Sequence, residues 1–268
     1  SSFTNVLGAE GAAIFNSGRI RVAAGKDANL KGDLFLDNTG IVRVEAKASL
    51  DIEACDVNGC PEVVQLNNGC LEGGTWIVLP GGSLDLPGTE ITKLGAGTEV
   101  ELAGEFDELA SLDEVDYDAR FVVENDVQLA DSVTNRGITR IQPPGTGEGD
   151  SVLDVDGNID NEVDNETSIM GDMEHDLVIA AHGSGGGFNG FICDNLNNNA
   201  NVLPGGEGEP GPFNVKGNFD QGETGVLNIE IGGFMPIDQH DQLRVEGNVA
   251  LAGALDVGFL GQFDPDVG

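Results

Sequence analysis

The sequence predicts an all-β protein, folded as an irregular parallel β-solenoid. Apolar and polar residues alternate in short runs along the chain, which is the period of a β-strand with one buried face. Gly, Asn or Asp occupies nearly every gap between the runs, and these residues tolerate the left-handed conformations of tight turns. Short strands that follow one another in this way indicate stacked coils. A β-sandwich has a similar spacing of strands and is the alternative fold.

The expected strands of the N-terminal part are, in chain order, residues 20–22, 34–36, 42–44, 50–52, 76–78, 84–86, 100–102, 121–123, 127–129, 138–141 and 152–155. The frequent asparagines favour stacked coils over a sandwich, because Asn side chains can form ladders between successive turns. Helical signals are scarce. The best one is 107–116, where apolar residues share one side after an acidic start.

The clearest alternation lies near the C-terminus, in residues 225–258. Four short strands follow one another there, and glycines separate them. If these strands line a solenoid, the apolar positions should be buried and the polar ones exposed. The positions expected to be buried are Leu243, Val245, Leu251, Leu255 and Val257; those expected to be exposed are Arg244, Glu246 and Asp256.

The same segment resembles the repeat-rich β-solenoid regions of secreted bacterial surface proteins, of the autotransporter-passenger and sorting-signal-anchored kind. The matching residues are Leu227, Ile229, Ile231, Gly232, Gly233, Asp241, Gln242, Leu243, Val245, Gly247, Leu251, Gly253, Leu255 and Val257. His240 departs from the pattern, where an aromatic residue is expected. The resemblance covers about 50 residues well. It implies a right-handed solenoid outside a bacterial cell and brings no catalytic residues with it.

The charge of the chain narrows its partners. It carries 47 acidic and 12 basic residues, a formal net charge of −35. A field of this sign repels DNA, RNA and anionic lipid headgroups, so we expect no nucleic-acid binding and no binding to a membrane surface. No run approaches the roughly 20 apolar residues that span a bilayer. The charge then serves as a solvated surface suited to salty water, binds divalent cations or recognises a cationic partner.

A Pro- and Gly-rich segment, 142–150, suggests a division into an N-terminal solenoid part, 1–142, and a C-terminal part, 143–268. The C-terminal part includes a long Gly- and Asn-rich loop, expected at 182–212. The chain opens without a basic and then apolar signal segment, and it ends inside the repeat pattern. We therefore expect a mature fragment that lacks a signal, an anchor or further repeats.

The cysteines suggest export. Cys55, Cys60, Cys70 and Cys193 are an even set in an acidic, loop-rich chain, which favours disulfides. Cys55 and Cys60 enclose an Asn-Gly turn, so a bridge between them would leave Cys70 to pair with Cys193. Four cysteines allow three connectivities, and the sequence does not decide among them. Zinc is disfavoured, because the cysteines lack CxxC spacing and the histidines lie far along the chain.

Calcium is the one cofactor that the sequence suggests. Asp154, Asp156, Asn158 and Asp160 alternate, so their oxygens could converge on one ion. The EF-hand pattern fails, because its required Gly and Glu are missing, and a strand with an Asp-Gly-Asn turn is the competing interpretation. Seven acids between residues 105 and 118 form either a solvated face or a second cation site.

One short region places histidines among carboxylates: Glu174, His175 and Asp176, with His182 nearby. A general base or a metal site could be built there, and Ser184 could be a nucleophile. However, the glycines around Ser184 do not form the G-x-S-x-G pattern, so an exposed polar loop is the competing interpretation. Paired carboxylates indicate no glycosidase here, because so acidic a chain contains many pairs by chance.

We therefore expect an extracellular structural or adhesive surface protein without catalytic activity that associates head to tail. Its expected partners are further copies, other surface proteins or polysaccharide. The alternative is a carbohydrate-active or carbohydrate-binding β-helix protein, such as a lyase or glycosidase. One Trp and one Tyr are few for stacking on sugars, which counts against it. A third option is a soluble calcium-binding module of a larger secreted protein.

Overall fold

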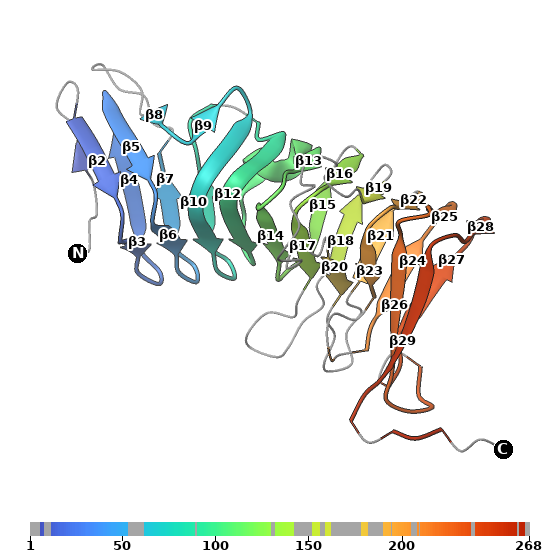
Figure 1. The fold of residues 1–268 in the computed structure, drawn as a ribbon. Helices are drawn as coiled ribbons and strands as arrows, with labels where there is room; N and C mark the ends of the chain where they lie inside the picture. The colour runs from blue at the N-terminus through green and yellow to red at the C-terminus, as the bar shows by residue number, and fades with distance from the viewer. Residues whose placement is uncertain are drawn as a thin grey trace. The chain divides into compact units, whose positions relative to one another are not determined.

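The computed structural model is all-β and forms two compact units, one of residues 1–112 and 118–121, the other of residues 113–117 and 122–268. Each unit is a parallel solenoid in which strands stack coil upon coil (Figure 1), so the predicted fold class is confirmed and the sandwich is excluded. The division lies upstream of the 142–150 segment. The residues that the structure describes are 6–7, 12–52, 62–88, 90–129, 132–141, 152–155, 159–161, 178–181, 190–193, 195–204, 208, 210–236, 239–261 and 263–265.

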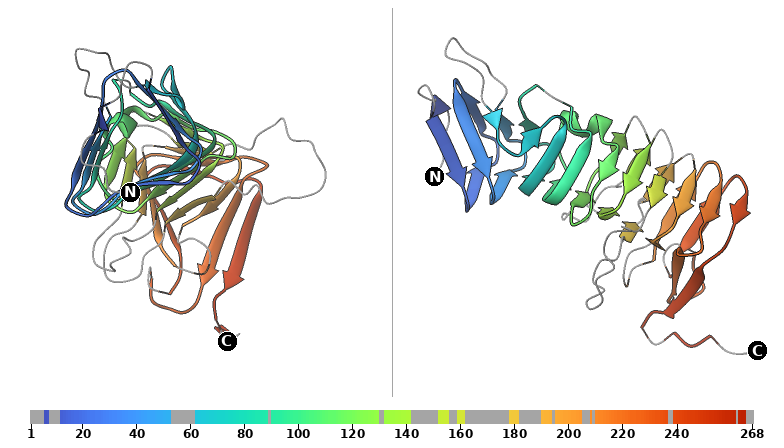
Figure 2. Two further views of the ribbon diagram at one scale, coloured as in Figure 1. Left: turned by 90° about the vertical axis from the view of Figure 1, so that its left-hand side faces the viewer. Right: turned by 45° about the horizontal axis from the view of Figure 1, so that its top comes forward.

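The first unit winds through three parallel sheets, which form the sides of its coils (Figure 2). One sheet contains β1 (Val6–Leu7), β4 (Asp27–Lys31), β7 (Ser49–Asp51) and β11 (Ser83–Asp85). The second contains β2 (Ala12–Asn16), β5 (Leu34–Asn38) and β8 (Glu62–Val63). The third contains β3 (Arg19–Val22), β6 (Ile41–Val44), β10 (Cys70–Val78) and β12 (Lys93–Leu102). β9 (Leu66–Asn67) pairs antiparallel with β10, and η1 (Asp107–Ser111) is a single 3-10 turn.

The second unit also has three parallel sets of strands. The first set contains β13 (Glu114–Val115), β16 (Val133–Asn135), β19 (Ile159–Asn161), β22 (Leu196–Asn198), β25 (Phe219–Gln221) and β28 (Val249–Ala250). The second contains β17 (Ile138–Ile141), β20 (Val178–Ala181), β23 (Asn201–Leu203), β26 (Val226–Ile231) and β29 (Ala254–Phe259). The third contains β15 (Val127–Leu129), β18 (Val152–Val155), β21 (Gly190–Cys193), β24 (Pro212–Val215) and β27 (Gln242–Val245). β14 (Arg120–Val123) spans the division between the units.

The range 182–212, where the sequence suggests one long loop, contains strands β21, β22 and β23. The physical reason is that several of its asparagines are coil residues. Asn198 aligns with Asn161 in the coil before it and with Gln221 in the coil after it. Asparagine is frequent in loops, but at a solenoid corner it also bonds between coils, so composition alone cannot separate the two cases.

The core consists of straight rows of apolar side chains, one residue from each coil. In the first unit Val22, Val44, Val78 and Leu102 are aligned in register, and all four are buried. Arg19 pairs with Ile41, 22 residues further on, which gives the length of a short coil. The next coil needs 34 residues, since Ile41 pairs with Thr75, yet the register of the rows continues. Insertions therefore enter between strands and leave the core unchanged.

Buried amide side chains form ladders at one corner of the coils, as the sequence suggests. In the first unit the Asn16 side chain donates to Asn38 Oδ1 at 2.7 Å and to the Ile41 carbonyl at 3.0 Å. In the second unit the Asn198 side chain lies 3.3 Å from the Val226 carbonyl and 3.4 Å from Gln221 Oε1. Asn198 Oδ1 accepts the Ala200 N–H at 3.2 Å. These bonds satisfy backbone groups that the corner removes from the strand ladders.

Gly74 allows the first ladder to continue past β10. Its backbone has φ of 75° beside an irregularity in the pairing of β10 with β12. A Cβ at this position would lie 2.5 Å from the Asn38 carbonyl oxygen. Only glycine therefore combines this backbone conformation with the close approach of the Asn38 backbone.

Replacing Asn198 by Ala should destabilise the second unit by roughly 1–3 kcal/mol, because buried backbone groups lose their partners. The matched control is Asn197→Ala, at the neighbouring and only half-buried position. Urea unfolding followed by circular dichroism measures both variants. Equal effects of the two changes would contradict the proposed contribution of the ladder.

Candidate functional site

The last coil of the second unit leaves its apolar interior uncovered. Val249 aligns with Phe219 of the preceding coil, and Leu255 aligns with Leu227. Phe219 is 0% exposed and Leu227 is 7% exposed, whereas Val249 is 51% exposed and Leu255 is 61% exposed. The side chains of the last coil therefore continue the core rows, but no described coil packs on them.

The expectation that Leu251, Leu255 and Val257 are buried was wrong, since their exposed fractions are 63%, 61% and 43%. Leu243 and Val245 are half-buried, while Arg244, Glu246 and Asp256 are exposed as predicted. The alternation predicts which face a residue occupies. It does not show whether another coil covers that face.

An aromatic cluster extends this apolar surface. Phe234, in the loop between β26 and β27, makes an edge-to-face contact with Phe263, with ring centroids 5.3 Å apart. Phe263 also lies 6.3 Å from Phe259 at the end of β29. Phe234 is 82% exposed, and Met235 and Phe259 are each 57% exposed. Exposed apolar residues that gather in this way commonly mark an interaction surface.

Asp241 holds the base of that loop. Its side chain is buried, and its two carboxylate oxygens accept the Glu230 N–H at 2.7 Å and the Gly211 N–H at 2.9 Å. Its own N–H donates to the Glu230 carbonyl at 3.0 Å. Asp241 thus ties the edge of β26 to the segment before β24. The neighbouring His240 ring lies 3.1 Å from the Gly233 carbonyl, so this departure from the repeat pattern also supports the loop.

Burial raises the pKa of Asp241 to about 6, and the nearby Glu230 carboxylate adds to the increase. The two backbone N–H groups favour the charged form and oppose this shift only in part. At neutral pH the site therefore holds a desolvated negative charge beside the uncovered coil.

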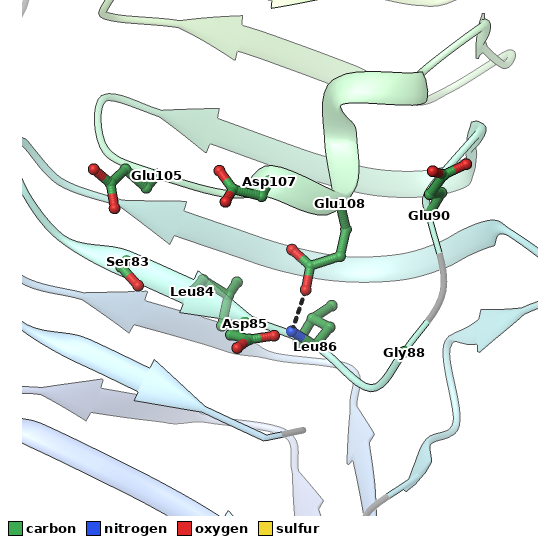
Figure 3. Close-up of a pocket in the computed structure, with 9 residues that line it drawn as sticks. All are labelled: Ser83, Leu84, Asp85, Leu86, Gly88, Glu90, Glu105, Asp107 and Glu108. Atoms are coloured by element: carbon green, nitrogen blue, oxygen red, sulfur yellow. Dashed lines mark hydrogen bonds between the residues drawn. The ribbon is translucent and has the colours of Figure 1, made fainter. Parts of the chain in front are cut away.

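The first unit contains an acidic cavity of about 480 Å³. Five carboxylates line it (Figure 3), and they belong to Asp85, Glu90, Glu105, Asp107 and Glu108. The turn η1 and the end of β11 place them together. Glu108 Oε1 accepts the Leu86 N–H at 2.7 Å, while Glu108 Oε2 is buried without a hydrogen-bond partner among the described residues.

This cavity can accept hydrogen bonds from hydroxyl groups or attract a cation, and neither histidine nor an aromatic ring is among its lining residues. The sequence indicated only part of it, as the acidic run 105–118. It missed Asp85 and Glu90, because only the stacking of coils brings them beside η1. In the described part of the chain, no three His, Cys, Asp or Glu side chains are placed to hold one metal ion.

The predicted calcium residues are described only in part. Asp154 lies in β18 and Asp160 lies in β19, two strands of different sheets, while Asp156 and Asn158 fall outside the described residues. In sequence register, Asn158 precedes Ile159 as Asn195 precedes Leu196. Asn195 Oδ1 accepts the Asn218 N–H at 2.8 Å, so this position serves a second ladder of the coils. Calcium binding here stays a prediction.

Of the cysteines, Cys70 begins β10, is half-buried and has its Sγ 3.8 Å from Glu72 Oε1. Cys193 ends β21, in register with Val155 and Val215. Cys55 and Cys60 fall outside the described residues, so the disulfide pairing stays a prediction.

The histidine-containing candidates Glu174, His175, Asp176, His182 and Ser184 also fall outside the described residues. Within the part of the chain that is described, no helix is long and apolar enough to cross a membrane.

Comparison with known proteins gives no relative to argue from: no family model, no curated protein and no solved structure matches the chain. The site must therefore be interpreted from its own geometry.

Asp241 should make folding of the last coils more favourable at pH 5 than at pH 7.5. Its pKa is higher in the folded state, so its stabilising contribution is complete below about 3.8 and is lost as the pH rises through about 6. The difference in unfolding free energy between the native protein and Asp241→Asn should increase by about 1 kcal/mol from pH 7.5 to pH 5. Urea unfolding at both pH values measures it, with the exposed Asp256→Asn as control. A difference that does not change with pH would refute the assignment.

Proposed function

We propose that the protein is an exported structural or adhesive component of a cell surface, without catalytic activity, and that it associates through the ends of its coils. The observation that carries this proposal is the uncovered apolar interior of the last coil, where Val249, Leu251, Leu255 and Val257 are 43–63% exposed. Continuous exposed apolar surface on a soluble protein usually marks a place where another surface binds.

The architecture supports association more than catalysis. In a solenoid each coil packs only on its neighbours, so an end coil offers both a core and the free edges of its strands. Chemical groups suited to catalysis are not brought together at this end. The −35 charge keeps copies apart in dilute buffer, and divalent cations or salt weaken that repulsion. The extracellular setting rests on the sequence pattern and the cysteines.

The acidic cavity of the first unit supports a second candidate function, binding of carbohydrate. Carboxylates such as Asp107 and Glu105 can accept hydrogen bonds from sugar hydroxyls. Titration calorimetry with neutral oligosaccharides would test this candidate, with Asp107→Asn as the variant expected to weaken binding.

The native protein should increase in mass with concentration in the presence of calcium or high salt, and it should dissociate in chelator at low salt. The double substitution Leu255→Thr and Val257→Thr keeps β-branched residues in β29 but removes apolar surface, so we expect it to stay monomeric. Val64→Thr, at a 50% exposed site in the first unit, is the matched control and should still associate. Light scattering measures the masses. A native monomer of constant mass in every condition would refute association.

Export predicts that all four cysteines are oxidised. Alkylation of the unreduced protein followed by mass spectrometry should then show no labelled thiol. Four labelled thiols would argue for a reducing compartment and against the proposed location.

A further inference from the structure

The first coil of the first unit differs in charge from the rest of the chain. Six of the 12 basic residues lie within residues 1–47, against only five of the 47 acids. Residues 241–268 contain the opposite balance, with five acids and Arg244 as the one base. The two ends of the sequence are therefore complementary, although the whole chain is strongly acidic.

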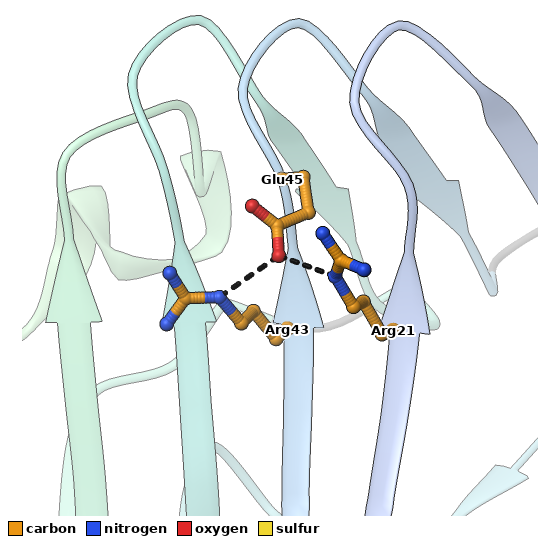
Figure 4. A network of polar contacts seen from close by, with 3 residues as sticks. All are labelled: Arg21, Arg43 and Glu45. Atoms are coloured by element: carbon orange, nitrogen blue, oxygen red, sulfur yellow. Dashed lines mark hydrogen bonds and ion pairs between the residues drawn. The ribbon is translucent and has the colours of Figure 1, made fainter.

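The basic end includes an incompletely neutralised arginine row. Arg21 on β3 and Arg43 on β6 are in register, and both donate to the same oxygen, Glu45 Oε1, at 2.5 and 3.1 Å (Figure 4). These hydrogen bonds, that from Arg21 above all, lower the pKa of Glu45. One carboxylate serves two guanidinium groups, and the Arg21 side chain remains 57% exposed. The row can therefore accept a second carboxylate.

The strand that carries Arg21 has the side-chain pattern that β29 would need in a partner. β6 occupies one edge of β3, and no other strand of the described chain has a recorded register with its second edge. On β3, the half-buried Ile20 and the buried Val22 align with the core residues Val42 and Val44, while Arg21 lies between them on the outer face. On β29, Leu255 and Val257 continue core rows, and Asp256 lies between them.

We infer that the occupant of the uncovered last coil is the first coil of a second copy, with β29 paired in parallel to β3 and Asp256 beside Arg21. In this register Leu255 lies opposite Ile20 and Val257 opposite Val22, so the core rows continue from one copy into the next. This inference rests on the proposed association through coil ends and names its partner. The contact is heterologous, so it repeats and forms chains of copies.

The net repulsion between copies does not forbid this contact. At 0.15 M ionic strength the screening length is about 8 Å, so distant acids of the two copies interact weakly. The Asp256–Arg21 pair would form at contact distance, where screening is least effective, and burial of the apolar rows supplies the main attraction.

A charge swap tests the pairing. Arg21→Glu and Asp256→Arg should each weaken self-association at least about tenfold, because each places like charges at the contact. The two variants mixed should form a dimer and nothing longer, since only one matched pair of ends remains. The double variant should associate like the native protein. Sedimentation velocity in calcium-containing buffer measures all four samples.

Arg43→Glu is the matched control. It makes the same charge change and also breaks a pair with Glu45, but one coil away from the end. It should associate far more strongly than Arg21→Glu, and thermal unfolding should show similar stability for both. Failure of the double variant to associate, while Leu255→Thr with Val257→Thr still abolishes association, would refute this partner and leave association through the coil end intact. A native protein that stays monomeric would refute both.

Discussion

Every feature of this protein depends on parallel pairing between successive coils. Each strand donates and accepts backbone hydrogen bonds along both edges, and the in-register stacking aligns equivalent side chains in rows. The row of Val22, Val44, Val78 and Leu102 shows the result, since one apolar residue per coil suffices for a dry interior. A chain with 5% aromatic residues can fold in this way, because a narrow core needs no bulky side chains. The same rule makes each coil dependent on the next one for cover.

The period-two alternation was sufficient to predict the fold class, because the residue pattern of a half-buried strand is a local property. The inward and outward positions of β29 were also predictable, as Asp256 and Leu255 illustrate. The exposure of Leu255 was not, since cover comes from a coil that the local sequence does not encode. Likewise, Asn198 looked like a loop residue, because only the stacked neighbours reveal its ladder.

The candidate sites show the same division. Asp241 belonged to the repeat pattern that the sequence analysis identified, but its role required the positions of Glu230 and Gly211, which approach it only in the folded coils. The acidic cavity combines Asp85 with Glu108, residues that one coil separates in the sequence. Ladder bonds within one coil corner are recognisable from composition. Sites built across coils require the register, which varies here with each insertion.

The insertion of residues between β7 and β8 has a practical consequence. The coil that contains it is 34 residues long in place of 22, yet Thr75 still pairs with Ile41 and Ser83 with Ser49. The protein therefore tolerates additional sequence at a coil corner without a change in the strands on either side. This makes the corner between Ile52 and Glu62 a natural graft position, where a foreign epitope or affinity tag could be displayed on a rigid scaffold.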